Sequence, residues 1–222
     1  KLTAVIEKFF WDEEKGAYID SFTSGRRNVT RHANIFAILF SIADETKQEK
    51  ILKNVLENDE IPAITTPYFN FFELDVLCRM GKLTEVLDKI RSYWGGMLDL
   101  GAVTFWEEYD PSVPKEEQYD MYGDHFGKSL CHAWAASPIY FLAKYFAGLD
   151  LVNKDGVTYI LKPQMQYFTD LDCTLPVGSN GVVRLVWDGE ILEITPNADG
   201  GILELGEQKL SLVRGETRRV KI

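Results

Sequence analysis

The strongest constraint on the fold is a change of sequence pattern near Gly148. Before this glycine, apolar residues recur at helical spacing; after it, apolar and polar residues alternate between turn-forming glycines, as in strands. Aromatic residues are concentrated in the first part. Those that follow the glycine are Tyr159, Tyr167, Phe168 and Trp187. A chain of 222 residues is long enough for two modest cores, so the sequence predicts two domains.

The first part contains segments with helical periodicity. Some, such as Thr30–Ala43, are apolar on nearly all sides, whereas others, such as Lys47–Leu56, are amphipathic. A double ring of helices needs this alternation, because its inner helices are buried on both sides and its outer helices on one. An α/α toroid or solenoid is therefore favoured over a simple bundle. The expected helices are Leu2–Phe10, Thr30–Ala43, Lys47–Leu56, Pro67–Met80, Thr84–Tyr93 and Ser129–Phe146.

The second part has the pattern of an antiparallel sheet. The runs Gly181–Trp187 and Glu190–Thr195 flank Asp188-Gly189, a pair that favours a tight hairpin turn. Alternation continues in the last residues of the chain, again with glycines in the turns. The sequence predicts a small antiparallel β-sandwich of about 70 residues. Its further strands are expected at Gly201–Leu205, Lys209–Val213 and Thr217–Ile222.

Charge and hydropathy exclude several classes of partner. The net charge of −10 argues against binding to nucleic acid or to anionic membranes. No run of about 18 apolar residues occurs, so no transmembrane helix is expected. The chain opens on Lys1 without a methionine or a signal peptide, which indicates a trimmed start or a piece of a longer protein. A periplasmic or secreted location is favoured, and a cytoplasmic one stays open.

No metal or cofactor site is expected. The cysteines Cys78, Cys131 and Cys173 lack CxxC spacing and clustered histidines, so they are predicted to be small buried hydrophobic residues. The acidic stretch 110–124 lacks the Asp-x-Asp-x-Asp-Gly pattern of a calcium loop. A solvated charge run is the simpler interpretation.

Glu107 is the leading candidate for chemistry. It lies in the long Gly- and Pro-containing segment 95–128, and long loops in compact domains tend to be functional. Aromatic faces beside a carboxylate suit a pyranose ring, whose apolar faces stack while an acid or base acts on its oxygens. Glycoside hydrolysis normally needs a second carboxyl group. The aromatic residues near Glu107 in sequence are Tyr93, Trp94, Phe105, Trp106 and Tyr109.

Five motifs are spread over most of the chain: His32-Ala-Asn34, Thr66-Pro-Tyr-Phe69, Gly101-Ala-Val-Thr-Phe-Trp-Glu107, Ser129-Leu-Cys-His132 and Ala147-Gly-Leu149. With these motifs the chain resembles bacterial α-L-rhamnosidases of glycoside hydrolase family 78, in their C-terminal portion. The resemblance implies an (α/α)6 barrel whose second half corresponds to residues 1–149, followed by a β-sandwich domain at 150–222. It also implies that the chain is a fragment of an inverting glycosidase acting on terminal α-L-rhamnose.

The resemblance assigns roles to individual residues. Glu107 is similar to the general base, and His132 to an active-site neighbour, whereas Cys131 replaces the usual asparagine. The family's general acid lies in an Asp-Glu-Arg segment, and no such segment occurs here. A chain with the base but without the acid is expected to be inactive alone, because losing general acid catalysis costs about 10²–10⁴-fold. The expected substrate-binding residues are Trp106, His132, Trp94 and Tyr109.

Each candidate also has a structural interpretation. Glu108 is expected to be solvated or to support its neighbour, and a structural role for His132 is as favoured as a sugar contact. His125 is interpreted as surface, His32 as a core histidine, and Phe69, Phe71 and Phe72 as core. The indoles of Trp94 and Trp106 either stack on sugar or fill the helical interior.

Two other functions stay open at this stage. One is a carbohydrate-binding or structural module without a reacting carboxylate, and the other is a different (α/α)6 carbohydrate-active enzyme. Rhamnose-containing glycans or glycosides are the expected partners. Since half a toroid leaves inner-helix faces uncovered, self-association through the cut edge is also expected.

Overall fold

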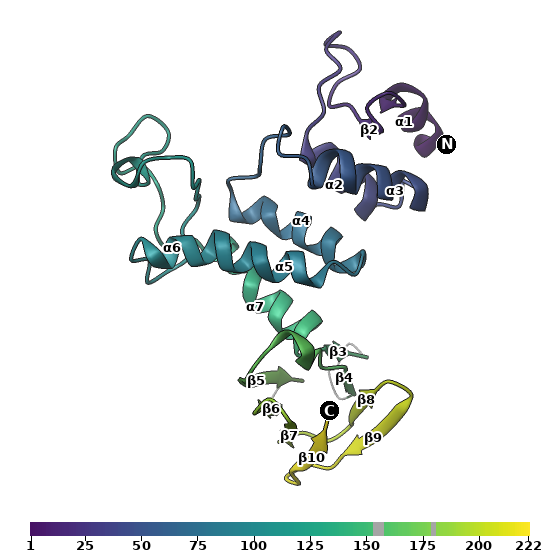
Figure 1. Cartoon of the computed structure of the whole chain (residues 1–222), viewed down its shortest axis with the longest axis vertical. Coiled ribbons are helices and arrows are strands. Elements are labelled where there is room, and N and C mark those ends of the chain that lie inside the picture. Colours follow the sequence, from purple (N-terminus) through teal and green to yellow (C-terminus); the bar gives the residue numbers. More distant parts are fainter. Residues whose placement is uncertain (153–157, 179–180) are drawn as a thin grey trace. The chain divides into compact units, whose positions relative to one another are not determined.

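The computed structural model of the chain describes residues 1–152, 158–178 and 181–222. The chain divides into two compact units, Lys1–Ser137 and Pro138–Ile222 (Figure 1). The first unit is mainly helical, and the second contains two sheets, as the change of sequence pattern predicts. Residues 153–157 and 179–180 of the expected β-domain lie outside the described residues.

The first unit opens with helix α1 (Leu2–Phe10) and a short hairpin of β1 (Trp11–Asp12) and β2 (Ala17–Tyr18). The helix is at its predicted position, whereas the hairpin was not predicted. Its turn depends on one side chain, since Asp12 Oδ1 accepts hydrogen bonds from the backbone N–H groups of Glu14 at 3.0 Å and Lys15 at 3.1 Å. Strands of two residues are too short to show periodicity.

The next helices confirm the predicted segments with small shifts at their ends. Asp44 caps α3 by accepting a bond from Lys47 N at 2.9 Å, and Pro67 starts α4, where a missing N–H is tolerated. Each of the helices α2, α4 and α5 has a fully buried side chain, namely Ile35, Leu74 and Val86 respectively. The elements are α2 (Arg31–Leu39), α3 (Glu45–Ile51) with the π-helical turn Leu52–Leu56, α4 (Pro67–Arg79) and α5 (Leu83–Lys89).

Helix α5 continues beyond its predicted end at Tyr93. A π-helical turn, Ile90–Trp94, leads directly into α6 (Gly95–Asp99). Gly96 is a helical position that needs a glycine, because the Tyr109 ring packs against it. A Cβ there would lie 2.3 Å from the Tyr109 hydroxyl oxygen. The glycine pair that suggested a loop instead permits close packing between the helix and the segment around Glu107.

The helix predicted over Ser129–Phe146 is wrong in its first half. Residues 129–136 form an irregular segment with one 3₁₀ turn at Ala133–Ala135. Helix α7 (Ser137–Phe141) has Pro138 in its first turn. It continues as a π-helical turn through Phe146. Proline has no N–H, and in a longer helix its ring would clash with the carbonyl of Trp134, so the helix starts here.

The second unit contains two four-stranded sheets, with strand orders β10-β7-β6-β5 and β3-β4-β8-β9. The predicted hairpin is confirmed as β6 and β7, which pair Leu185 with Ile194. The strands before it were not predicted, and β4 and β8 pair in parallel, which departs from the expected all-antiparallel arrangement. The strands are β3 (Leu149–Leu151), β4 (Tyr159–Leu161), β5 (Leu171–Val177), β6 (Gly181–Trp187), β7 (Ile191–Pro196), β8 (Gly201–Leu205), β9 (Gln208–Leu212) and β10 (Arg218–Lys221).

Both sheets contribute side chains to one core. Val183, Leu185 and Ile194 come from the first sheet, and Tyr159 and Leu203 from the second; all are fully buried. Alternate residues along β6 are buried and less buried, which follows from the two-residue period of a strand. The unit therefore has a core of its own.

Candidate active-site loop

The segment around Glu107 is held by pairing with a later part of the same loop. Glu107 N donates to Ser129 O at 2.9 Å, and His132 N donates to Phe105 O at 2.8 Å. These two bonds place residues 105–107 beside 129–132, so the two motifs that the sequence singled out lie next to each other. These two bonds pair backbone groups of this irregular region without a helix or a strand.

The Glu107 carboxylate is bound through both oxygens. Oε1 accepts from the Tyr122 hydroxyl at 3.0 Å, and Oε2 accepts from Ser129 N at 3.1 Å. The side chain is half-buried, and the Tyr122 ring is 82% exposed, so the group lies at the surface of the unit. The hydrogen bond to the carboxylate raises the pKa of Tyr122, which keeps the phenol protonated as a donor.

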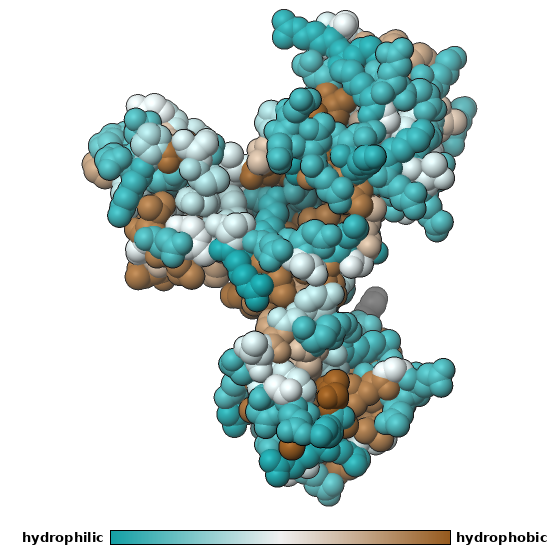
Figure 2. Space-filling view, in the orientation of Figure 1, coloured by the Kyte–Doolittle hydropathy of each residue, from teal (hydrophilic) through white to brown (hydrophobic). Residues whose placement is uncertain are grey.

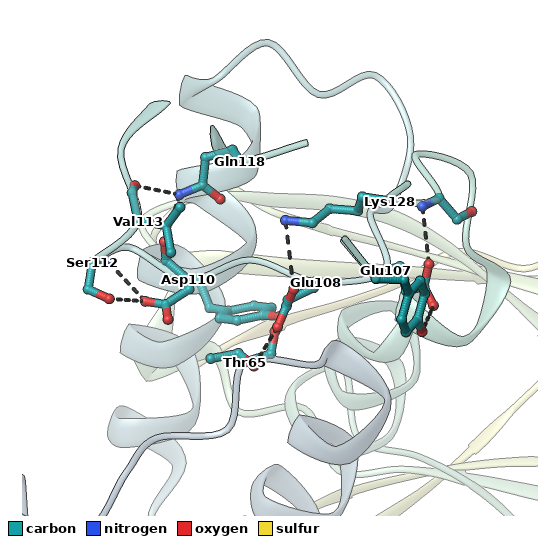
Figure 3. Close-up of polar contacts among 11 residues, drawn as sticks. Thr65, Glu107, Glu108, Asp110, Ser112, Val113, Gln118 and Lys128 are labelled. Atoms are coloured by element: carbon teal, nitrogen blue, oxygen red, sulfur yellow. Dashed lines mark hydrogen bonds and ion pairs between the residues drawn. The ribbon is translucent and has the colours of Figure 1, made fainter. Parts of the chain in front are cut away.

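Glu108 points to different partners (Figure 3). Its Oε1 accepts from Thr65 Oγ1 at 2.9 Å, and its Oε2 lies 4.0 Å from Lys128 Nζ. The Lys128 side chain is buried, and burial lowers its pKa. The two neighbouring carboxylates therefore have separate partners. Glu108 links the loop to the residues before α4.

The rest of the loop is fastened by a buried amide. Gln118 Nε2 donates to Asp110 O at 2.6 Å and to Val113 O at 2.8 Å (Figure 3). His125 Nδ1 lies 2.6 Å from Asp120 Oδ1 at the surface, as predicted for this histidine. Among the described residues, no group of three or more His, Cys, Asp or Glu side chains is arranged to hold a metal ion.

The aromatic residues nearest Glu107 in sequence lie in the interior. Trp106 is 3% exposed, and Trp94 is 6% exposed with its indole N–H donating to Ala135 O at 2.8 Å. Tyr109 is half-buried, with its ring 5.5 Å from that of Tyr93. These positions support the loop and the helix beneath it. A sugar contact by Trp94, Trp106 or Tyr109 stays a prediction.

His132 leads to a different set of aromatic residues. It is half-buried, and its ring centre lies 5.8 Å from that of Trp134, which is 69% exposed. Trp134 in turn lies 5.3 Å from Tyr68, also exposed. The exposed tryptophan was not predicted as a site residue. The sequence feature that could have indicated Trp134 is its position two residues after His132.

The rings continue along α2 and α4 as one connected group. Tyr68 contacts Phe72, Phe72 contacts Phe36, and Phe36 contacts Phe69, with centre-to-centre distances between 5.3 and 5.8 Å. His32 ends the group, 4.0 Å from Phe69. We refer to these residues as the aromatic row; its members are His32, Phe36, Tyr68, Phe69, Phe72 and Trp134.

The aromatic row corrects the interpretation of His32 and the phenylalanines as core. His32 is exposed, and Phe69, Phe71 and Phe72 are only half-buried. The four-residue spacing of His32 and Phe36 places them on one face of α2, and no described element covers that face completely. Figure 2 shows hydrophobic groups interrupting a largely hydrophilic surface. The aromatic row is therefore accessible at the surface of the first unit.

Comparisons with known proteins place the chain near one group of enzymes. No protein-family model and no curated protein matches the sequence. A glycoside hydrolase family 78 rhamnosidase of Bacillus sp. GL1 is similar in structure, with a TM-score of 0.74 and 25% identity over 93% of this chain. The α-L-rhamnosidase of Dictyoglumus thermophilum shares the fold, with a TM-score of 0.63 and 20% identity over 93% of this chain.

The resemblance predicted from the sequence is confirmed at the level of structure. The chain spans only 22% of the Bacillus enzyme and 23% of the Dictyoglumus enzyme. It is thus related to a part of a glycoside hydrolase. No helix among the described residues is long and apolar enough to cross a membrane.

Proposed function

We propose that the chain is the C-terminal part of an inverting glycoside hydrolase that releases terminal α-L-rhamnose, with Glu107 as its general base. The observation that carries the proposal is the Glu107 carboxylate, bound by donors through both oxygens at the surface of a loop paired with the His132 segment. The structural similarity to a rhamnosidase supports the substrate class.

In this proposal residues 1–149 belong to the second half of an (α/α)6 barrel, and residues 150–222 form a β-sandwich domain. The succession of helices in the first unit and the shared core of two sheets in the second support it. An inverting glycosidase separates its carboxyl groups by about 6.5–9.5 Å, so that a water molecule fits between the base and the sugar. Glu107 would activate that water, and the acid would come from outside this chain.

The aromatic row and His132 would form the sugar-binding surface. Trp134 and Tyr68 present exposed rings, and the His132 ring is close to Trp134. Apolar faces of a pyranose stack on such rings, while imidazole groups bond its hydroxyls. Trp106, Trp94 and Tyr109 would contribute from beneath the loop, by holding Glu107 in place.

The test of the reaction uses two proteins. The 222-residue chain is expected to show no turnover of an aryl α-L-rhamnoside, because it lacks the acid; measurable turnover would refute that part. In the longer protein that completes the barrel, Glu107→Gln should abolish turnover and leave the fold intact. Glu116→Gln is the matched control, since it removes an exposed carboxylate from the same loop. A near-normal kcat in Glu107→Gln would remove Glu107 from the mechanism.

A carbohydrate-binding module is the second candidate, and the exposure of the aromatic row favours it. Calorimetric titration of the chain with rhamnose and with unrelated sugars distinguishes the two functions. Binding that is lost in Trp134→Ala, together with no hydrolysis by the longer protein, would support the module. An activity panel on that protein would identify a different carbohydrate-active enzyme.

Self-association through uncovered helix faces is also proposed. Exposed apolar side chains such as Phe40 and Leu98 support it, because extended apolar surface seldom stays uncovered on soluble monomers. Light scattering at increasing concentration should show a mass above that of the monomer. A constant monomer mass would contradict this proposal.

A further inference from the structure

The turn 121–127 in the loop is closed by several bonds. Met121 and Asp124 exchange two backbone hydrogen bonds of 3.0 Å, and Gly127 N donates to Asp124 O at 3.2 Å. Asp124 Oδ1 accepts from Phe126 N at 3.1 Å. A Cβ at Gly127 would lie 2.2 Å from the Met121 carbonyl oxygen, so only glycine permits this closure. The backbone of the turn is thereby held in one form.

Tyr122 occupies an unfavourable conformation within this turn. Its φ is 56°, in the left-handed region that residues with a Cβ rarely adopt. Its ring is largely exposed, so burial of the ring does not account for its position. The turn places the Tyr122 hydroxyl 3.0 Å from Glu107 Oε1, to which it donates a hydrogen bond.

We propose that Tyr122 is a positioning residue for Glu107, an inference that rests on the proposed role of Glu107 as a base. The phenol donates to Oε1 and the Ser129 N–H donates to Oε2. Two donors on different oxygens fix the plane of the carboxylate. A general base needs this fixed orientation, because it must direct a remaining lone pair at the water.

The charges around the phenol are consistent with a donor role. Glu107 and, less strongly, Glu108 raise the pKa of Tyr122, so the hydroxyl keeps its proton well above neutral pH. Lys128 is the nearby cation, since it interacts with both carboxylates. The other titratable groups within the turn are Asp124 and His125, and the His125 Nδ1 lies 2.6 Å from Asp120 Oδ1.

The test is a nuclear magnetic resonance titration of the 222-residue chain with ¹³Cζ-labelled tyrosine. Tyr122→Phe identifies the Tyr122 signal. In the unmodified chain, that signal should titrate above the ordinary value of about 10, and in Glu107→Gln its midpoint should fall toward that value. Glu116→Gln, which removes another carboxylate of the loop, should leave the midpoint unchanged. Glu107→Asp, which keeps the charge but shortens the side chain, should also lower it.

A second measurement reports on orientation. Hydrogen exchange at the Ser129 amide should rise by about 3- to 10-fold in Tyr122→Phe, because the carboxylate that accepts from this amide becomes free to rotate. Tyr119→Phe, a loss of hydroxyl in the same loop, should leave it unchanged. An unchanged Tyr122 midpoint in Glu107→Gln, or an unchanged Ser129 exchange rate in Tyr122→Phe, would overturn the proposal. Neither measurement needs turnover, so failure of the proposed hydrolase function is detected separately.

Discussion

Arg31 and Glu73 form a buried ion pair, with Arg31 Nη1 3.2 Å from Glu73 Oε1 and side-chain exposures of 8% and 3%. Lys89 Nζ binds the same carboxylate oxygen, and Arg31 Nη1 also donates to Leu56 O at 2.9 Å. The group therefore connects α2, α4 and α5 with the π-helical turn after α3. Burial lowers the pKa of Lys89, as expected for a cation removed from water.

Removing Glu73 should strongly destabilise the first unit. Glu73→Ala leaves two cations in the interior without their carboxylate, so we expect a loss of about 3–5 kcal/mol in the free energy of unfolding. Asp88→Ala is the control, because its pair with Arg91 is exposed and such pairs contribute less than about 1 kcal/mol. Urea denaturation followed by circular dichroism measures both. Equal effects would contradict the importance of the buried cluster.

The three cysteines should differ in reactivity. Cys131 is exposed, Cys173 is half-buried and Cys78 is buried, and burial raises the pKa of Cys78 to about 12. Since the thiolate is the reactive form, a disulfide reagent at pH 8 should modify Cys131 first and Cys78 only after unfolding. Counting released thiols against time in the chain and in Cys131→Ser checks this. The prediction fails if the fast phase persists in Cys131→Ser.

Gly148, at the change of sequence pattern, should not tolerate a side chain. Its φ is 74°, and a Cβ would lie 2.1 Å from the carbonyl oxygen of Lys162. Gly148→Ala should therefore cost more than about 2 kcal/mol of stability in the second unit. Gly215 has a similar φ of 80° with no heavy atom within 4 Å of the added Cβ, so Gly215→Ala should cost only about 1 kcal/mol. Thermal unfolding of both variants separates the cost of the left-handed φ, which both share, from the cost of the steric clash, which only Gly148→Ala has.

The first unit should lose stability in acid through Asp12. The hydrogen bond from Arg27 Nε, at 2.6 Å, lowers the pKa of Asp12 below its ordinary value of 3.8. A carboxyl group with a lowered pKa stabilises the folded state above the unfolded pKa, and this contribution is lost as the pH falls through the folded one. Arg27→Gln should lower the melting temperature at pH 6 more than at pH 2. A difference that does not depend on pH would refute the role of the ion pair.

How much could be predicted depended on the range of the interactions. The hairpin of β6 and β7 needs only alternating residues and the turn Asp188-Gly189, and both are local in sequence. The start of α4 at Pro67 was predicted for the same reason, whereas α3 begins at Glu45, two residues before its predicted start. The segment 129–136 was misassigned because its apolar composition suits a helix, whereas its backbone pairs with residues 105–107 instead.

The sequence by itself determined the change from helices to strands near Gly148, the candidate Glu107 and the resemblance to rhamnosidases, because these depend on local pattern and on motifs. Only the tertiary structure decided which aromatic residues are buried and which are exposed. Trp94 and Trp106 lie in the interior, whereas Trp134 and His32 lie at the surface. The contact of Tyr122 with Glu107 was likewise invisible in the sequence, since it depends on a left-handed turn closed by bonds between Met121 and Asp124. Burial and orientation are set by packing between segments distant in sequence, which periodicity cannot report.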